Sequence, residues 1–484
     1  MPANGVFSER YGQLRTLRAQ VQESHAGLSE YVLQCLWYDT LLPREGLRTA
    51  EGQALEIVSP GWWNHGPGPD FQNAHLRFNG REKSGDVEID FAHSGWRDHG
   101  HYLDERYSRV VLHVVWENDP PAKVPVTAAG RPLPTLLLPR FVELETIALL
   151  DAVAPETPAT APTAQAGRCA ALIPRQGTEP LLAFLRLAGE WRMLNKARLL
   201  RQRMAAAGPS QAIYEEVVTA CGYGRFKEHF RGIGRSLPYD RARQLARQDP
   251  LLLEAAYLQL AGLLPDALPA GTTAAPHYGR LRGLRRDHLA SLRSLPFTWA
   301  RGGIRPNNYP ERRLAGLARF VARTAERGLT ATLEDVWRGD AKPIVRRRAL
   351  EALFPSATGF WATHCSWTGT RLRTPAAPLG AGRVRSIIGN VFVPAGVALA
   401  RQERDRVREG VLHDFFAALP KEPDNHIVRA MLPHVTGEQK PFPLTFQLQQ
   451  GLLQMHQDWC EPNPTCRNCP VFERLDLSAL TRGT

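Results

Sequence analysis

Two acidic residues in the first third of the chain lie where a metal-dependent hydrolase could use them. Asp70 lies in a Gly-Pro loop directly before a β-type run, and Glu88 lies at the middle of the next such run. Because neighbouring antiparallel strands lie about 4.8 Å apart, an Asp on one strand and a Glu on the next can converge on one cation. Carboxylate oxygens with open water positions suit Mg²⁺ or Mn²⁺, and such an ion can hold a phosphodiester and activate a water molecule. The pair therefore predicts a metal site for phosphodiester hydrolysis.

The run around Glu88 alternates acidic with aliphatic residues. Asp86, Glu88 and Asp90 therefore point to one face of a strand, and the two aliphatic residues between them point to the other. Three acids on one strand face repel one another unless the face is solvated or binds cations. A solvated outer face is the ordinary explanation for such a pattern. The Pro-Asp pair upstream and the order of the elements favour cation binding instead.

The elements that position these acids are predicted by hydrophobic periodicity. A helix is expected over 28–42, and the passage WRDHGHYLDERY should form a short helix. Strands are expected at 54–58, 74–78, 86–91, 110–116 and near 135–138. The short helix falls between the third and fourth strands. Residues 1–150 are therefore expected to form one domain with α-β-β-β-α-β order.

With these residues in this order, the passage over residues 28–140 resembles the PD-(D/E)XK phosphodiesterase superfamily. The nuclease core of that superfamily carries the Asp of a Pro-Asp pair at the start of its second strand and a Glu-x-Lys on its third. Pro69-Asp70 and Glu88-Ile89-Asp90 fall at matching places, and Glu30 falls where many of these nucleases carry another metal-site acid. The resemblance implies a restriction-endonuclease-like fold with Mg²⁺ or Mn²⁺ on Asp70 and Glu88, assisted by Glu30 or Asp90.

The sequence departs from that pattern at the motif lysine, because Asp90 occupies its position. Either the lysine's role has moved to another residue or catalysis is lost. His99 and His101 flank a glycine at the entrance of the predicted short helix and are candidates for that role. His113 reads more readily as a core histidine of its strand, and Lys83 as a solvated turn residue.

The rest of the chain is predicted to be mainly helical. Residues 151–167 are rich in Ala, Pro and Thr and read as a linker, and residues 168–455 follow with helical periodicity. Basic residues interleaved with aromatic ones in this region suit a nucleic-acid backbone. The candidates for binding nucleic acid are Arg192, Lys196, Arg225, Arg231, Arg305 and Arg312. The alternative is a set of solvated basic faces in an arginine-biased protein.

Residues 456–484 contain a cluster with metal-ligand spacing. The cluster comprises His456, Cys460, Cys466 and Cys469. These residues could form a closed Cys₃His zinc site, which is normally structural. An iron–sulfur cluster is an alternative and needs a fourth thiolate, such as Cys169 brought across the fold. The loop resembles the iron–sulfur loop of helix-hairpin-helix DNA glycosylases, although its first spacing is shorter. Three ordinary cysteines remain the third interpretation.

Charge and composition narrow the class of partner. The 484-residue chain has 60 basic and 48 acidic residues, which leaves a net charge of +12 and favours a polyanion such as DNA or RNA. Only seven of the basic residues are lysines, so part of the charge reflects arginine-biased composition. No apolar run reaches about 18 residues and no signal peptide is recognisable, so we expect a cytoplasmic protein without a membrane partner.

The whole chain resembles an uncharacterised bacterial family of unknown function. The passages that carry the resemblance are GPDFQNAHL, GDVEID, WRDHGHYLDERY, VVLHVV, RPNNYPERRL and the terminal cysteine cluster. The expected fold is an α/β nuclease-like domain followed by an all-α region and a small C-terminal metal knuckle. The expected function is metal-dependent phosphodiester hydrolysis of nucleic acid. The alternatives are a non-catalytic nucleic-acid-binding or assembly protein on a degenerate nuclease fold, and a protein that acts on a small anionic molecule.

Overall fold

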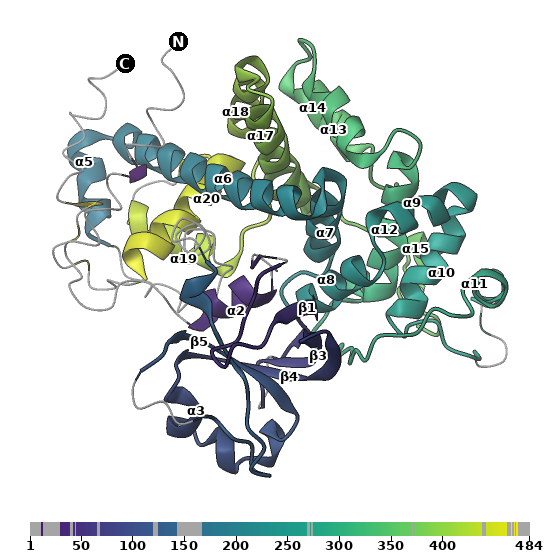
Figure 1. Ribbon diagram of the computed structural model, residues 1–484. Coiled ribbons are helices and arrows are strands. Elements are labelled where there is room, and N and C mark those ends of the chain that lie inside the picture. The colour runs from purple at the N-terminus through teal and green to yellow at the C-terminus, as the bar shows by residue number, and fades with distance from the viewer. Residues whose placement is uncertain are drawn as a thin grey trace. The chain divides into compact units, whose positions relative to one another are not determined.

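The computed structural model in Figure 1 falls into two units, Ala19–Thr157 and Met1–Arg18 together with Pro158–Thr484. The residues that the structure describes are 11–12, 30–38, 42–43, 45–64, 68–119, 124–142, 167–268, 272, 274–369, 371–437, 442–461, 466, 469 and 471–472. The predicted linker at 151–167 lies outside the described residues except for its last position, and so does most of the predicted tail at 456–484 beyond Glu461. The predicted division into an N-terminal sheet region and a helical C-terminal region is confirmed.

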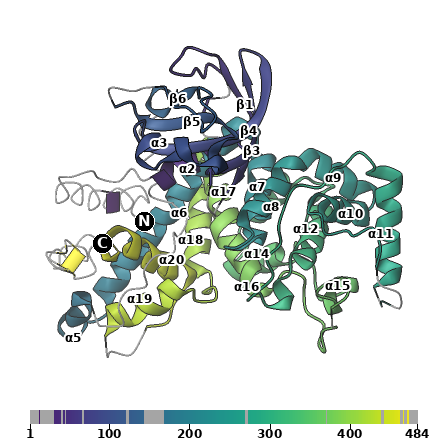
Figure 2. The ribbon, with the colours of Figure 1, turned by 90° about the horizontal axis from the view of Figure 1, so that it is seen from below.

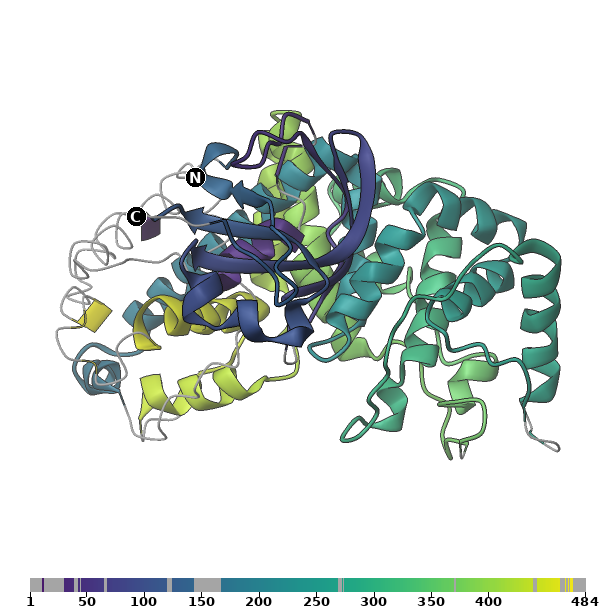
Figure 3. The ribbon, with the colours of Figure 1, turned by 60° about the horizontal axis from the view of Figure 1, so that its bottom comes forward.

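The first unit is built on one mixed sheet. Its elements are α2 (Glu30–Tyr38), β1 (Leu55–Ser59), β2 (Trp62–Trp63), β3 (Phe71–Phe78), β4 (Arg81–Ala92), α3 (Gly95–Asp98), the 3₁₀ turns η1 (His101–Leu103) and η2 (Glu105–Tyr107), β5 (Val110–Glu117), β6 (Thr135–Leu137) and the 3₁₀ turn η3 (Leu138–Arg140). The strand order is β1-β3-β4-β5-β6, and β2 pairs with β3. β1, β3 and β4 are antiparallel, whereas β5 runs parallel to β4 and β6 parallel to β5. Figure 3 shows the twist of this sheet.

Local sequence explains the two central pairings. Asn79 and Gly80 join β3 to β4 and both adopt positive φ angles, which is the conformation that a two-residue hairpin turn requires. β5 is apolar and buried from Val110 to Val115 except for His113, which is also buried, as is typical of a strand covered on both faces in a parallel arrangement. The hairpin sets the register from Phe78 opposite Arg81 to Ala74 opposite Gly85, and an irregularity between Phe71 and Ala74 then shifts the pairing so that Phe71 lies opposite Val87.

The passage WRDHGHYLDERY does not form the single short helix that we expect from its sequence. α3 covers only four residues, and two 3₁₀ turns follow it. The break falls at Gly100, whose φ of 76° lies in the left-handed region and ends the helix. This break places His99 before the turn and His101 after it, so the two imidazoles belong to different local elements.

The second unit is helical. Its elements are η4 (Arg168–Leu172), α5 (Ile173–Gln176), α6 (Glu179–Ala207), α7 (Pro209–Cys221), α8 (Lys227–Ser236), α9 (Tyr239–Gln248), α10 (Pro250–Leu260), α11 (Ala275–His288), η5 (Pro306–Asn308), α12 (Pro310–Thr324), α13 (Leu329–Trp337), α14 (Pro343–Glu351), α15 (Phe360–Thr363), α16 (Ala381–Ile387), η6 (Ile388–Phe392), α17 (Val393–Gln402), α18 (Arg406–Ala418), α19 (His426–Thr436), α20 (Phe446–Met455) and η7 (His456–Cys460). Both η6 and η7 are π-helical turns. The long α6 runs beside α20 and α17 (Figures 1 and 2).

Glycines allow α6 and α20 to pack closely. A side chain at Gly189 would collide with the backbone carbonyl of Gln447, and a side chain at Gly451 would collide with that of Leu185. One hydrophobic core of this unit lies among α6–α18, and a second joins Tyr11, the start of α6, α19 and α20. Tyr11, within the range predicted as the first domain, therefore packs in the helical unit.

One helical run meets the length and composition of a membrane span. It covers Ala381–Gln402, which is α16, η6 and α17 together, and 78% of its 18-residue apolar window is buried inside the structure. This burial is that of a core helix, because α17 packs against α6 and α18.

Candidate active site

Asp70 and Glu88 are joined by hydrogen bonds across the start of the β3–β4 pair. The Asp70 backbone N–H donates to Glu88 Oε2 at 3.0 Å, and Asp70 Oδ2 accepts from the Ile89 backbone N–H at 3.0 Å. Gln34 on α2 donates its side-chain amide to Asp70 Oδ1 at 2.8 Å. The loop acid and the strand acid that the sequence singles out are therefore brought together, and α2 contributes a donor to the pair.

The two carboxylates lie in surroundings that disfavour their charged forms. Burial, followed by the charge of Glu88, raises the pKa of Asp70 to about 8. Burial, followed by the charge of Asp90, raises the pKa of Glu88 to about 9. A bound cation would reverse both effects, because it supplies the opposite charge that a buried carboxylate pair lacks. The electrostatics of the pair are therefore those of a site that suits a divalent ion.

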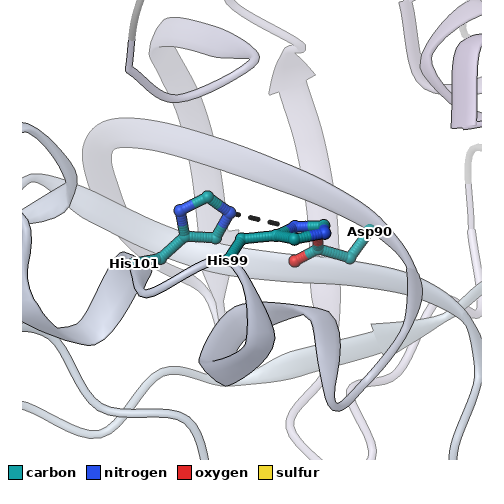
Figure 4. A group of neighbouring side chains, drawn as sticks. All are labelled: Asp90, His99 and His101. Atoms are coloured by element: carbon teal, nitrogen blue, oxygen red, sulfur yellow. Dashed lines mark hydrogen bonds and ion pairs between the residues drawn. The ribbon is translucent and has the colours of Figure 1, made fainter.

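Asp90 lies at the centre of a group of imidazoles. His99 Nδ1 lies 3.0 Å from Asp90 Oδ1, and His113 Nε2 lies 2.8 Å from Asp90 Oδ2. His101 Nε2 lies 4.0 Å from Asp90 Oδ1 and 3.1 Å from Glu88 Oε1, so its ring lies beside both strand acids. Figure 4 shows His99 and His101 gathered at the Asp90 carboxylate. The Asp90 carboxylate is therefore surrounded by three histidine side chains.

The members of this group differ in their access to solvent. The His99 side chain is 51% exposed, whereas the Asp90 carboxylate is 2% exposed and His113 is fully buried. Burial lowers the pKa of His101, whose ring stacks on Tyr107 with centroids 4.0 Å apart. His99 is thus a solvent-accessible imidazole held by a buried carboxylate, which is the arrangement that orients a proton-transfer histidine.

A close approach of the backbone keeps Asp90 in place. A Cβ atom at Gly95, the first residue of α3, would lie 2.8 Å from both Cγ and Oδ1 of Asp90. Only glycine fits there without moving the carboxylate. Gly95 therefore allows α3 to lie directly against the acid that holds His99.

One group of ligand atoms in this unit has the spacing of a metal site. Among the residues that the structure describes, Asp90, His99 and His101 offer one oxygen and two nitrogens that all lie within 4.8 Å of one another. A mixed carboxylate and imidazole set suits first-row transition metals, whereas the carboxylates of Asp70 and Glu88 suit Mg²⁺ or Mn²⁺. All five residues are candidates from the sequence alone, but the spacing along the chain does not predict this grouping.

The remaining predicted residues of the sheet unit lie at the margin of the site. Glu30 at the start of α2 is exposed and accepts a 3.4 Å hydrogen bond from the Phe91 backbone N–H. Its charge contributes to the raised pKa of Glu88. Lys83 lies further along β4, opposite Leu76, with Nζ 5.7 Å from the centre of the Phe78 ring. Glu30 thus lies close enough to act on the site.

The solvated strand face considered for Asp86, Glu88 and Asp90 does not occur. All three side chains are buried, between 1% and 6% exposed. Asp86 accepts from the Asn73 backbone N–H at 2.9 Å. The apolar run of β5 could have indicated this burial. β5 pairs with β4 and is buried on both faces, so other elements must cover both faces of the sheet at this point.

The six basic residues proposed to bind nucleic acid divide into two groups. Arg225 and Arg305 are exposed, and Lys196 is half-buried with its ammonium on the side-chain oxygens of Asn390 and Gln450. The other three are buried, at most 7% exposed: Arg192, Arg231 and Arg312. Arg312 donates to four backbone carbonyls in the helical unit, those of Trp361, His364, Ala376 and Ala377. These three guanidinium groups are therefore buried inside the helical unit.

The C-terminal candidates lie in the helical unit. Cys460, Cys466 and Cys469 form no disulfide, and Cys469 is buried. Nδ1 of His456 lies 3.8 Å from a carboxylate oxygen of Glu461. The spacing of the three cysteines could be read from the sequence, whereas their neighbours in space could not.

The chain belongs to the family described as "Protein of unknown function (DUF2851)", whose model matches residues 30–425. The expected membership of a family without an assigned function is confirmed. The match includes every residue of the site on the sheet and ends before the three C-terminal cysteines. No curated protein matches the chain. No solved structure matches it either.

Proposed function

We propose that this protein is a metal-dependent phosphodiester hydrolase that acts on DNA or RNA. The observation that carries the proposal is the interlocked pair of half-buried Asp70 and buried Glu88 at the start of the β3–β4 pairing, continued along β4 by the Asp90–His99 pair. The two acids, beside an oriented and exposed imidazole, provide the groups for holding a cation and for moving a proton.

The topology of the sheet unit supports the proposal. A helix precedes three antiparallel strands, and a helical segment then leads to a strand parallel to the third. Apart from the two-residue strand β2, which pairs with β3, this order agrees with the α-β-β-β-α-β order expected of the restriction-endonuclease-like core that the sequence resembles, and the agreement supports the proposal. Asp70 directly precedes β3 and Glu88 lies inside β4, at the positions that the resemblance implies for the metal-site acids.

The donor set of the acid pair fits Mg²⁺ or Mn²⁺. Asp70 Oδ1, Asp70 Oδ2 and Glu88 Oε2 each accept one hydrogen bond from the protein and keep a second lone pair, so both residues retain capacity toward a cation. A cation there supplies Lewis-acid polarisation of the phosphate and a more acidic water. Glu30, which is exposed and close to Glu88, completes the set of acids.

The chain's own residues provide the positioning and the proton transfer. Gln34 and the Ile89 backbone amide fix the Asp70 carboxylate, and the Asp70 backbone N–H fixes that of Glu88. Asp90 orients His99, whose ring reaches solvent and accepts the proton of the attacking water. In this assignment His99 takes over the part of the motif lysine, and Asp90 is its positioning residue.

A cleavage assay with the full chain tests the proposal. Supercoiled DNA, single-stranded DNA and RNA are incubated with Mg²⁺ or Mn²⁺, or with a chelator. At least one substrate should be cut only with metal, and Asp70→Asn or Glu88→Gln should abolish cutting. His99→Ala should slow it by about 10²–10⁴-fold, the usual contribution of a general base. Cleavage unchanged in both acid variants refutes the site, and salt-dependent binding without cleavage supports the non-catalytic alternative.

Glu82→Gln is the matched control for the acid variants. Glu82 lies on the same strand, but its side chain is 74% exposed and pairs with Arg77. Its replacement should leave the cleavage rate within about twofold of wild type, since surface ion pairs contribute little to structure.

A further inference from the structure

We propose that Cys169, Cys460, Cys466 and Cys469 together hold an iron–sulfur cluster in the helical unit. The first ligand comes from η4, and the other three come from the C-terminal segment. The site is independent of the sheet unit and of the hydrolase proposed there. In this ligand set the thiolate of Cys169 is the fourth ligand, in place of His456 in the Cys₃His alternative.

Contacts around each cysteine place the two segments together. Arg168, next to Cys169, donates to the Cys466 carbonyl at 3.2 Å, and its guanidinium lies 4.0 Å from the centre of the Phe472 ring. Cys169 and Cys469 belong to the same buried cluster of side chains, and Cys460 packs against that cluster. None of the four forms a disulfide. Residues far apart in the sequence thus bring the four cysteines to one part of the helical unit.

The thiols are close enough to act on one another electrostatically. Burial, together with the charges of Cys469 and Cys466, raises the pKa of Cys169 to about 12. Burial and the same two neighbours, with Cys169, raise the pKa of Cys460 well above its ordinary value. These mutual effects place the four sulfurs near one another, and a metal centre would hold such cysteines as thiolates.

The spread of the sulfurs favours a cluster over a single ion. A tetrahedral zinc ion with Zn–S bonds of about 2.3 Å holds its sulfurs roughly 3.8 Å apart. Among the residues that the structure describes, the four cysteines include no three whose sulfurs lie within 4.8 Å of one another. Four thiolates around a multi-iron core lie further apart than around one ion, as Cys₄ ligation of [2Fe–2S] or [4Fe–4S] requires.

The surroundings supply what such a cluster needs. Apolar side chains of the second core, including Trp459 and Phe442, cover the cysteines. Arg168 brings a positive charge beside Cys169 and Cys469, whose thiol pKa values it lowers against the opposing effect of burial. His434 Nε2 lies 3.9 Å from the Cys466 sulfur, within reach of an N–H···S hydrogen bond. Positive charge and donors around the sulfurs stabilise an anionic cluster.

Metal and sulfide analysis of the full chain tests the proposal. The protein is purified without oxygen and reconstituted with ferrous iron and sulfide under a thiol reductant. Iron and acid-labile sulfide should be present in equal amounts, about two to four of each per chain, with a broad visible absorption that bleaches on reduction. One zinc per chain without sulfide overturns the proposal. A reconstituted chain that holds no metal overturns it equally.

Substitutions identify the ligands. Cys169→Ser should lower the iron content of the folded chain by about fivefold or more, because the fourth ligand is lost. Cys221→Ser is the matched control, because Cys221 is also a buried free cysteine but lies in the other core. His456→Gln should leave the iron content unchanged. Full iron content in Cys169→Ser, or loss of iron in His456→Gln, contradicts the ligand set, and circular dichroism confirms that each variant is folded.

Discussion

Replacing Glu88 with glutamine should remove a pH-dependent destabilisation of the sheet unit in metal-free protein. Glu88 is 6% exposed, and burial and Asp90 raise its pKa from 4.5 to about 9. Between these two values the folded state holds a proton that the unfolded state has lost. Stability therefore falls as the pH rises through this window, and the loss ends above the folded pKa. Glutamine copies the protonated acid and does not titrate.

The size of the effect follows from the shift. A group that is protonated when folded and ionised when unfolded changes the free energy of unfolding by about 1.4 kcal/mol per pH unit. Between about pH 5.5 and pH 8 the wild type should therefore lose about 3 kcal/mol relative to Glu88→Gln. Saturating Mn²⁺ should remove most of this loss in the wild type only, because the cation stabilises the ionised carboxylate.

Hydrogen exchange read by mass spectrometry on peptides from β3 and β4 measures the effect within the sheet unit. The opening free energies, corrected for the intrinsic pH dependence of exchange, are compared for wild type, Glu88→Gln and the exposed control Glu82→Gln. Glu82→Gln should follow the wild type. Equal pH dependence in wild type and Glu88→Gln would show that Glu88 ionises in the folded state without penalty, and would refute the electrostatic reasoning.

Three further perturbations test other parts of the structure. Although burial opposes the shift, contacts with Glu190 and with a second glutamate raise the pKa of His413 to about 9. The folded helical unit therefore gains about 3 kcal/mol of stability that is present below pH 6.5 and is lost as the pH rises toward 9. His413→Gln should remove this contribution, as measured by urea unfolding. Arg312→Met leaves four backbone carbonyls, two on buried and two on half-buried residues, without their donor and should lower the unfolding free energy by about 3–5 kcal/mol, whereas the exposed Arg225→Met should change it by less than about 0.5 kcal/mol. Gly95→Ala pushes a Cβ into the Asp90 carboxylate and should lower kcat at least about tenfold with little change in KM; an unchanged kcat would separate Asp90 from the reaction.

Much of the sheet unit could be predicted because its signals are local. The alternation of acids and aliphatic residues from 86 to 90 indicates a strand, and the Asn79-Gly80 pair marks the hairpin before it. The order of helix and strands follows from the same kind of pattern. The break at Gly100 cannot be predicted from residue spacing. A glycine inside a helical pattern ends the helix only when its φ is positive, and the sequence does not show the sign of φ.

The burial of the acids and the inward arginines depend on contacts that local patterns do not contain. A period of two shows that Glu88 and Asp90 share a face but not that other elements cover it. Arginine is ordinarily a surface residue, so the sequence indicates a basic face where Arg312 instead holds backbone carbonyls in the interior. The approach of Cys169 to the C-terminal cysteines is likewise long-range, and spacing within the cluster could only suggest that a fourth thiolate was needed.

The dependence of nucleic-acid cleavage on Mn²⁺ in wild type and in Glu88→Gln, measured side by side on one labelled substrate, tests the central claim most directly. We expect a wild-type rate that rises with Mn²⁺ to saturation and a variant rate at the level of the chelator control at every concentration. A variant that cuts at the wild-type rate, or a wild-type rate unaffected by removing the metal, would contradict the assignment of the acid pair.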